Sequence, residues 1–474
     1  MMESAPVTTR PLYLRPWHAF LREGREYVVN PARMISRRVP AGFTATLQRL
    51  DGDSTAPRTR EDEQELFGLE LASSQPVTGA AVKPLAEGGS VAPPIRSINL
   101  LIAQRCNLRC TYCYGGGDEY GEAGMMSEET ALRAVDWLLE QSGDSALVSV
   151  SFFGGEPLLA LPLLKKVTAH LRETAAAGKQ ANFAVATNGV LLDDEALAWF
   201  KENGFRLLVG FDGPPEMQDR NRPLRDGSPS SAAFLESARR ITEVMPEEAK
   251  FRATVLKSEE LPAVVEYMAD VSPGGYQTAF AAGCVSDDEA GEVLPSPADA
   301  IPYMEECVAA FLAAVQRGDE DEVRRWARWL DFGRALDMLR PQRPRRGHCG
   351  VGRVMAAVAS DGTIYACHRF VGSPEHKIGD VWHGLGDRSV FVDKPTFRQE
   401  PCRSCWAGNG CIGGCLQYNY TRTGDMFLPP EDNCLWTKAW IEAGIHLAHE
   451  LTDEDRAKLA EMQLVGERSC PWDL

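Results

Sequence analysis

The hydrophobic positions of this chain follow a repeating pattern from residue 96 onward. Short apolar runs typical of buried strands occur at 97–103, 147–153, 182–186, 205–211, 251–256 and 276–281. Between them, apolar residues recur every three or four positions, as on one face of a helix. Strands that alternate with helices are typical of a parallel sheet covered by helices. The pattern therefore predicts an α/β fold, specifically a partial (β/α)6 barrel of the TIM type.

The clearest expected helix begins after Ser127, whose hydroxyl is a good N-cap. Glu128 and Glu129 follow in the first turn, where negative charge complements the helix dipole. The other expected helices are 161–174, 193–203, 230–244 and 261–271, and a further helical region covers 298–339. In barrels of this kind the functional residues collect at the C-terminal ends of the strands. We therefore expect the functional residues in the loops that follow the strands.

The chain before this repeat has a different pattern. Apolar residues on both sides of 22–24 predict a hairpin, and a further strand at 34–39 and a helix at 61–70 follow. Prolines and glycines then punctuate a stretch without apolar periodicity. We therefore expect an N-terminal α+β module (1–70), a linker (71–95), the barrel (96–345) and a cysteine-rich C-terminal domain (346–474).

Composition and charge exclude several functional classes. The 474 residues are 44% hydrophobic and 25% charged, as in globular proteins, and the net charge is −17. That charge disfavours binding to nucleic acid or to anionic membranes. No apolar run approaches the roughly 20 residues needed to span a bilayer, and residues 1–10 lack a signal-peptide pattern. We expect a cytoplasmic protein whose thirteen cysteines stay reduced.

Three cysteines, Cys106, Cys110 and Cys113, lie on one short loop directly after the first expected strand. Three thiolates can hold three irons of a [4Fe–4S] cluster, which leaves the fourth iron open to a ligand. A zinc site is the alternative, although structural zinc usually takes four protein ligands. The CxxxCxxC spacing, with Tyr112 before the last cysteine, resembles the signature of the radical S-adenosylmethionine (SAM) enzymes. The resemblance implies that SAM binds the open iron and is cleaved to a 5′-deoxyadenosyl radical.

Further motifs resembling this family stand at the ends of later strands. A Gly-Gly-Glu-Pro loop follows the second strand, a Thr-Asn-Gly turn the third and Asp-Gly-Pro the fourth, and the fifth carries Arg-x-Thr. Each is common by itself, but their shared position makes coincidence improbable. The resemblance implies that Glu156 and the loop backbone receive the SAM ammonium and that Arg252 pairs with its carboxylate. The expected cofactor-binding residues are Tyr112, Gly154, Gly155, Glu156, Pro157, Asn188 and Arg252.

The loop after the fourth strand departs from the pattern of peptide-modifying members. Gly210 stands where those enzymes carry a serine, so one hydroxyl contact is missing. Asp219 and Arg222 match the downstream part of the motif. Asp212 is the candidate catalytic base.

Seven more cysteines lie between residues 349 and 434. Their spacing resembles the SPASM domain, which holds two auxiliary [4Fe–4S] clusters in peptide maturases. The resemblance implies an outer cluster on Cys402, Cys405, Cys411 and Cys434, and an inner cluster on Cys349, Cys367 and Cys415. A pair of zinc ribbons is the alternative.

The inner group lacks a fourth cysteine. Residues 350–366 contain none, whereas sulfatase-maturing relatives carry one there. The open position is then available to a substrate thiolate, to water or to a distant cysteine. The distant candidates are Cys284, Cys307 and Cys470.

Within the family, the chain resembles thioether-forming maturases of the ranthipeptide (SCIFF) type and the maturase of quinohemoprotein amine dehydrogenase. The resemblance implies sulfur-to-carbon crosslinks in a ribosomally made polypeptide. It also implies SAM, three [4Fe–4S] clusters, a cysteine-bearing peptide substrate and a reducing partner such as ferredoxin or flavodoxin. The alternatives are a sulfatase-maturing enzyme that makes formylglycine, a carbon–carbon peptide cyclase and a non-catalytic iron–sulfur or zinc protein. The N-terminal module either clamps a leader peptide by strand addition or serves as a packing subdomain.

Overall fold

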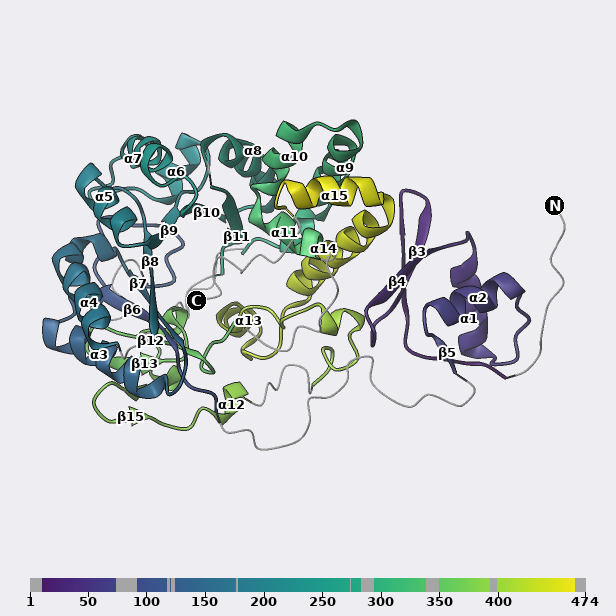
Figure 1. The fold of residues 1–474 in the computed structure, drawn as a ribbon, viewed down its shortest axis with the longest axis horizontal. Coiled ribbons are helices and arrows are strands. Elements are labelled where there is room, and N and C mark those ends of the chain that lie inside the picture. The colour runs from purple at the N-terminus through teal and green to yellow at the C-terminus, as the bar shows by residue number, and fades with distance from the viewer. Residues whose placement is uncertain are drawn as a thin grey trace.

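The computed structural model describes residues 11–73, 92–116, 120, 124–175, 178–272, 274–282, 294–337, 349–392 and 399–464. Its centre is a run of six parallel strands in chain order, which confirms the strand repeat and the partial barrel expected from the sequence (Figure 1). The strands are β6 (Ser97–Ala103), β7 (Leu147–Gly154), β8 (Gln180–Thr187), β9 (Phe205–Gly210), β10 (Ala249–Val255) and β11 (Tyr276–Phe280). Strand β6 is buried along its whole length, whereas buried and partly exposed residues alternate along β10.

Helices connect successive strands and bury one apolar face against them. The predicted N-cap is confirmed, since Ser127 Oγ accepts a hydrogen bond from the backbone N–H of Thr130 at 3.0 Å. Trp137 on the same helix is 1% exposed and belongs to the main core. The helices are α3 (Glu128–Gln141), α4 (Leu161–Thr174), α5 (Asp194–Glu202), α6 (Pro215–Asn221), α7 (Ser231–Val244) and α8 (Leu261–Val271).

The helical region expected at 298–339 is also confirmed. It consists of two longer helices and a short one, with a break at Gly318, whose φ of 72° suits glycine at a helix end. The elements are α9 (Ile301–Arg317), α10 (Glu320–Ala327) and α11 (Gly333–Asp337).

The sheet extends beyond the barrel strands into the C-terminal region. Strand β12 (Met355–Val358) pairs parallel with β6, and three antiparallel strands continue from it. The sequence patterns did not predict this extension, and the expected boundary near residue 345 falls outside the described residues. The added strands are β13 (Thr363–Tyr365), β14 (Lys377–Asp380) and β15 (Gly384–Leu385).

The N-terminal module contains the predicted hairpin, strand and second helix, together with a first helix that the patterns missed. Its three-stranded antiparallel sheet has the order β2-β3-β4, and a short pair β1–β5 closes the module. Leu71 is fully buried and β5 lies within the expected linker, of which 74–91 is outside the described residues. The elements are β1 (Tyr13–Leu14), β2 (His18–Arg22), β3 (Arg25–Asn30), β4 (Ile35–Val39), α1 (Phe43–Gly52), α2 (Arg60–Gly68) and β5 (Ala72–Ser73).

A long C-terminal helix, α14 (Glu431–Glu450), lies between the module and the barrel (Figure 1). On one side, Trp440 packs edge-on against Trp329, with ring centroids 5.4 Å apart. On the other, Ile441 and Ile445 share a small core with Tyr27 of the module. The remaining helices are α12 (Ser389–Val392), α13 (Leu416–Thr423) and α15 (Asp453–Glu461).

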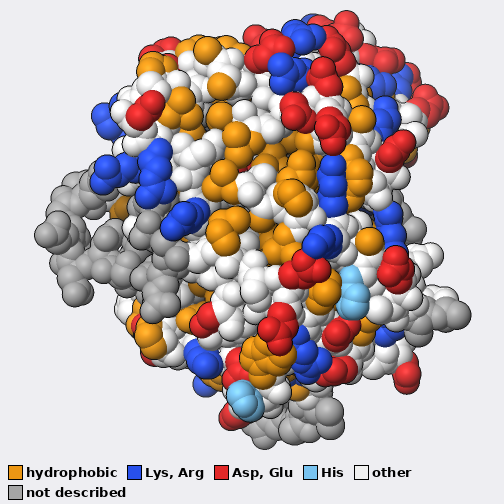
Figure 2. All heavy atoms as spheres, turned by 90° about the vertical axis from the view of Figure 1, so that its left-hand side faces the viewer, with side chains coloured by type: hydrophobic (Ala, Val, Ile, Leu, Met, Phe, Trp, Pro, Cys, Tyr) orange, Lys and Arg blue, Asp and Glu red, His pale blue; other side chains and the backbone are white. Residues whose placement is uncertain are grey.

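On the surface shown in Figure 2, hydrophobic side chains gather across the middle, with charged side chains of both signs around them. Among the described residues, no helix has both the length and the apolar character needed to cross a membrane.

Candidate functional site at the strand ends

The first cysteine loop leaves the end of β6 and runs beside the end of α6 and the residues that follow it. The backbone N–H groups of Arg109 and Thr111 donate to the carbonyls of Pro223 and Asn221, each at 2.9 Å. Burial, with smaller contributions from neighbouring charges, raises the pKa of Cys106 and of Cys110 to about 12. Buried thiols of this kind become ligands only when a cation draws off their protons.

The donor set of this loop fits an iron–sulfur cluster, because three soft sulfur donors share one short segment. In the described residues, no three His, Cys, Asp or Glu side chains are grouped so as to hold a single metal ion. The metal-binding role of the cysteines therefore stays a prediction.

The Gly-Gly-Glu-Pro loop lies directly against the start of the cysteine loop. The N–H groups of Gly155 and Glu156 donate to the carbonyls of Ala103 and Arg105, both at 2.8 Å. A Cβ added at Gly154 would lie 2.0 Å from the Ala103 oxygen, and one at Gly155 2.3 Å from the Arg105 oxygen. The glycines are thus required for close approach to protein backbone.

Glu156 points into the protein, in contrast to the expectation that it receives a ligand ammonium. Its side chain is 0% exposed, and its carboxylate accepts hydrogen bonds from the N–H groups of Leu158 and Asn188 and from the Thr187 hydroxyl, at 3.0, 2.8 and 2.7 Å. Burial raises its pKa to about 7, although these three donors act in the opposite direction. Glu156 therefore ties the end of β7 to the turn after β8, while Pro157 begins the short 3-10 helix that follows (Pro157–Ala160).

Asn188, in that turn, contacts the cysteine loop itself. Its Nδ2 donates to Asn107 Oδ1 at 2.7 Å and lies 3.7 Å from Cys106 Sγ. Its Oδ1 accepts from the N–H of Val190 at 3.0 Å, which fixes the orientation of the amide. The structure thus brings this predicted residue to the first cysteine.

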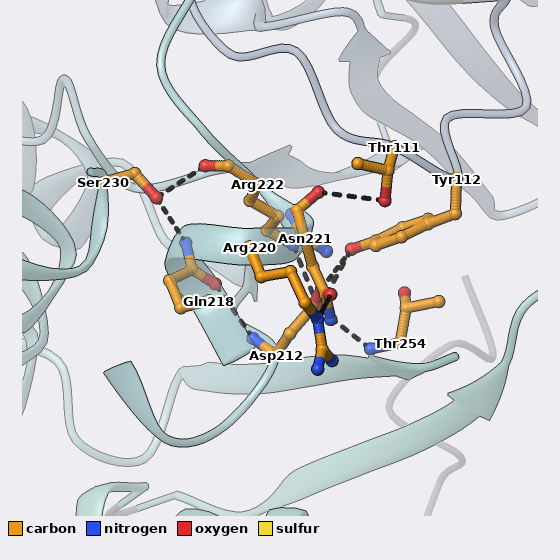
Figure 3. Close-up of polar contacts among 9 residues, drawn as sticks. All are labelled: Thr111, Tyr112, Asp212, Gln218, Arg220, Asn221, Arg222, Ser230 and Thr254. Atoms are coloured by element: carbon orange, nitrogen blue, oxygen red, sulfur yellow. Dashed lines mark hydrogen bonds and ion pairs between the residues drawn. The ribbon is translucent and has the colours of Figure 1, made fainter. Parts of the chain in front are cut away.

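Asp212 lies at the centre of a buried network on the other side of the loop (Figure 3). Its carboxylate, 1% exposed, accepts from the Tyr112 hydroxyl at 2.7 Å and from Arg222 Nε and Thr254 N–H at 3.0 Å each. The Arg222 guanidinium also lies over the Tyr112 ring, 5.4 Å from its centroid. A carboxylate with these three donors anchors the cysteine loop, and the role of Asp212 as a catalytic base stays a prediction.

The missing serine at position 210 also has a structural explanation. A Cβ at Gly210 would lie 2.5 Å from the end of the Arg222 guanidinium, which fills the space beside the strand. Gly210 thus leaves room for the arginine that pairs with Asp212.

The C-terminal cysteines fall into two sets according to the thiols that act on their pKa values, and their assignment as ligands stays a prediction. Burial raises the pKa of Cys367 to about 12, and the nearby thiols of Cys415 and Cys349 add to the shift. The pKa of Cys402 is likewise raised to about 12, first by burial and then by nearby thiols. The thiols that act on Cys402 are those of Cys434, Cys411 and Cys405.

The structure describes one of the three distant cysteines proposed as a fourth ligand of the inner group. Cys307 lies on α9 inside the main core, 1% exposed, and the groups that act on its pKa include no other cysteine. Nothing in these contacts favours Cys307 as the fourth ligand, which stays a prediction. Cys284 and Cys470 lie outside the described residues.

An aromatic and cationic layer joins the first cysteine loop to the inner group, and the sequence motifs gave little sign of it. His368, next to Cys367, lies over Phe153 with ring centroids 4.2 Å apart. Arg369 lies over the ring of Tyr114, 5.2 Å from its centroid. Burial, followed by the charges of Arg369 and Arg252, lowers the pKa of His368 to about 3, so its imidazole is neutral. Arg252, the predicted partner of a carboxylate, is among the charges that lower the pKa of His368.

Comparison with known proteins agrees with this arrangement. Residues 100–271 match the model of the Radical SAM superfamily. The chain is 26% identical over 365 residues to a serine-type anaerobic sulfatase-maturating enzyme of Klebsiella pneumoniae, covering 70% of this chain and 84% of that protein.

Two solved structures share the fold. One is native anSMEcpe with bound AdoMet and Cp18Cys peptide, with a TM-score of 0.61, 20% identity and coverage of 75% of this chain and 99% of that one. The other is Streptococcus suis SuiB bound to its precursor peptide SuiA, with a TM-score of 0.50, 13% identity and coverage of 90% and 99%.

Proposed function

We propose that this chain forms sulfur-to-carbon thioether crosslinks in a ribosomally made peptide or protein. The proposal starts from its place among the radical SAM maturases of the SPASM family. The observation that carries the proposal is the inner group of Cys349, Cys367 and Cys415. The thiols of Cys415 and Cys349 raise the pKa of Cys367, and the main contributions to the pKa of Cys349 and of Cys367 include no further cysteine. A substrate thiol is suited to the open position.

The cofactors that we assign are SAM and three [4Fe–4S] clusters. The first would be held by Cys106, Cys110 and Cys113, and the two auxiliary clusters by the inner and outer groups. When bound, the first cluster and SAM would supply a 5′-deoxyadenosyl radical able to remove a hydrogen atom from the substrate, and the auxiliary clusters would accept the electron left over. The product has lost one C–H hydrogen and one S–H hydrogen and has gained one C–S bond.

The protein's own side chains have supporting roles in this scheme. Asn188 and the Tyr112–Asp212 contact orient the first cysteine loop from two sides. Glu156 fixes the turn that carries Asn188. Arg252 offers a guanidinium to a carboxylate in the adjoining layer. A ferredoxin or flavodoxin would supply the electrons.

The N-terminal module is assigned a packing role on the C-terminal domain. Tyr27 and Val29 pack against Ala407, and His18 stacks on Trp406 with ring centroids 3.8 Å apart. The outer edges of β2 and β4 have no strand neighbour among the described residues. Strand addition by a leader peptide therefore stays compatible with the module.

Formylglycine formation is the second candidate, and the similarity to the Klebsiella pneumoniae enzyme favours it. Anaerobic, reduced full-length enzyme should be given SAM with two kinds of peptide. One kind is encoded beside its gene, and the other is a sulfatase-type peptide containing cysteine. A thioether product loses two hydrogen atoms and one alkylatable thiol, whereas formylglycine carries an aldehyde that reacts with hydrazines.

The control for this experiment is Cys106→Ala. It should abolish 5′-deoxyadenosine formation, because the first cluster would lose a ligand. An aldehyde product from the wild-type enzyme would replace the thioether proposal with the second candidate.

A further inference from the structure

The N-terminal module contacts a segment that carries two of the predicted outer cysteines. This segment, the outer segment, begins at Cys405, continues as the short 3-10 helix Trp406–Asn409 and ends at Cys411. Asn409 Nδ2 donates to the carbonyl of Pro31 in the module at 2.7 Å. The bond joins residues 378 positions apart, so it exists only while the module is docked.

An aromatic pair makes a second contact between the module and the outer segment. The imidazole of His18, on β2, lies on the indole of Trp406 with ring centroids 3.8 Å apart and planes 4° apart. Since a carboxylate only accepts, His18 Nε2 donates to Glu442 Oε1 of α14 at 2.8 Å, and this bond fixes the orientation of the imidazole. His18 therefore links the outer segment to α14.

A small apolar core lies beside this pair. Tyr27 and Val29 of β3 are 0% exposed and share the core with Ala407 of the outer segment and with Ile441 of α14. Cys405 itself packs against the same core. Side chains of the module are therefore in one packed group with a predicted cluster ligand.

The helix on which the module docks also carries a predicted outer cysteine. Cys434 lies near the start of α14, and Ile441 and Ile445 follow it about two and three helical turns later, so the three residues share one face. Ile441 and Ile445 both belong to the core with Tyr27. The module thus braces two separate pieces of chain, which together carry Cys405, Cys411 and Cys434.

The donor set of the outer group fits an iron–sulfur cluster, because thiolate sulfur is the usual ligand of iron in such clusters. Cys411 Sγ accepts a hydrogen bond from the backbone N–H of Gly413 at 3.2 Å, a contact that also suits a metal-bound thiolate. Ligands on separate pieces of chain keep their spacing only when the surrounding structure holds those pieces together. The contacts of the module supply such support.

We propose that the N-terminal module holds the outer cysteine group in place and retards the release of its iron, with His18 as the positioning residue. His18 acts through Trp406 and Glu442. The inference rests on the cofactors assigned under the proposed function, but it is independent of the thioether chemistry. The module then serves the cofactor of the C-terminal domain in addition to any contact with a leader peptide.

The test measures how fast iron leaves the anaerobically reconstituted, full-length enzyme after a ferrous-iron chelator is added. Cys434→Ala, which removes an outer ligand, identifies the kinetic phase that belongs to the outer group. The test variants are His18→Ala and His18→Phe. The second keeps an aromatic ring on Trp406 but loses the bond to Glu442.

Ser36→Ala is the matched control. It removes a bond of 3.0 Å between the module and His449, near the end of α14 opposite to Cys434. His18→Ala should release the outer iron about 10-fold faster than the wild type, or about 1.4 kcal/mol, as expected for the loss of an aromatic pair and a charge-assisted bond. His18→Phe should recover part of the protection, and Ser36→Ala should match the wild type.

An unchanged release rate in His18→Ala would overturn the proposal, whether limited proteolysis finds the module docked or detached. Identical iron release from the wild type and Cys434→Ala would do so too, because there would be no outer cluster to hold. Equal acceleration by Ser36→Ala would overturn the assignment to His18. Because iron release is read without SAM or peptide, these results stand apart from the thioether test.

Discussion

The network around Asp212 allows a test of whether this residue anchors the cysteine loop or acts as a catalytic base. Asp212 and Arg222 form an ion pair at 3.0 Å, with side chains 0% and 11% exposed. Removing one partner of a buried pair costs about 3–5 kcal/mol, because the other charge stays buried without compensation. Asp212→Asn keeps the shape and one acceptor oxygen, so we expect the lower end, about 3 kcal/mol.

That loss should lower the unfolding midpoint of the barrel by roughly 6–12 °C, at 2–4 °C per kcal/mol for a unit of this size. Scanning calorimetry of the anaerobic enzyme would measure it. Asp226→Asn is the control, because that carboxylate is exposed and bonds only locally to Ser228.

The anchoring role also predicts which catalytic step fails. Tyr112 lies within the cysteine loop, so loss of its partner should reduce iron loading of that loop and 5′-deoxyadenosine formation together. A variant with full iron content, normal SAM cleavage and no product would refute the anchoring role and restore Asp212 as a candidate base.

Three further predictions concern backbone approach, protonation and module packing. Gly155→Ala should disrupt the loop and lower SAM affinity, measured by equilibrium binding, whereas Gly52→Ala, with open space around it, should have no effect. Since the folded-state pKa of Glu156 is raised to about 7, the folded state holds a proton that the unfolded state releases above about pH 4.5. Stability should therefore fall between pH 4.5 and 7, by up to about 3 kcal/mol, and this slope should be absent from urea titrations of Glu156→Gln. Tyr27→Phe removes a donor to Glu450 at 2.7 Å and should weaken module packing by about 1 kcal/mol, seen as faster proteolysis between the module and the barrel.

The strand repeat was predictable because apolar periodicity reports burial directly. The motifs at the strand ends were predictable in position, since parallel strands bring their C-terminal ends to one edge. Their side-chain directions were not predictable. Glu156 lies in a motif associated with ligand binding, yet its partners Thr187 and Asn188 come from the next strand and turn.

Contacts across long sequence separations account for the other differences. The pairing of β12 with β6 joins residues more than 250 positions apart, and no local pattern in a four-residue strand predicts such a pairing. The contacts of Arg369 were not predictable from the sequence either. An arginine near a cysteine is common in sequences, and its role depends on neighbours that only the structure shows. The absence of a serine at Gly210 was visible, but its reason required the position of Arg222.

The first cysteine loop is held from three sides, and each contact comes from the end of a different strand. The backbone N–H of Glu156 bonds to Arg105, Asn188 bonds to Asn107, and Asp212 bonds to Tyr112. Loops attached only at their ends are mobile, whereas a loop with three separate attachments keeps its geometry before any ligand arrives. The sheet therefore preorganises the position of the thiols. A single change at any of the three strand ends should then affect cofactor loading before it affects the chemistry on the substrate.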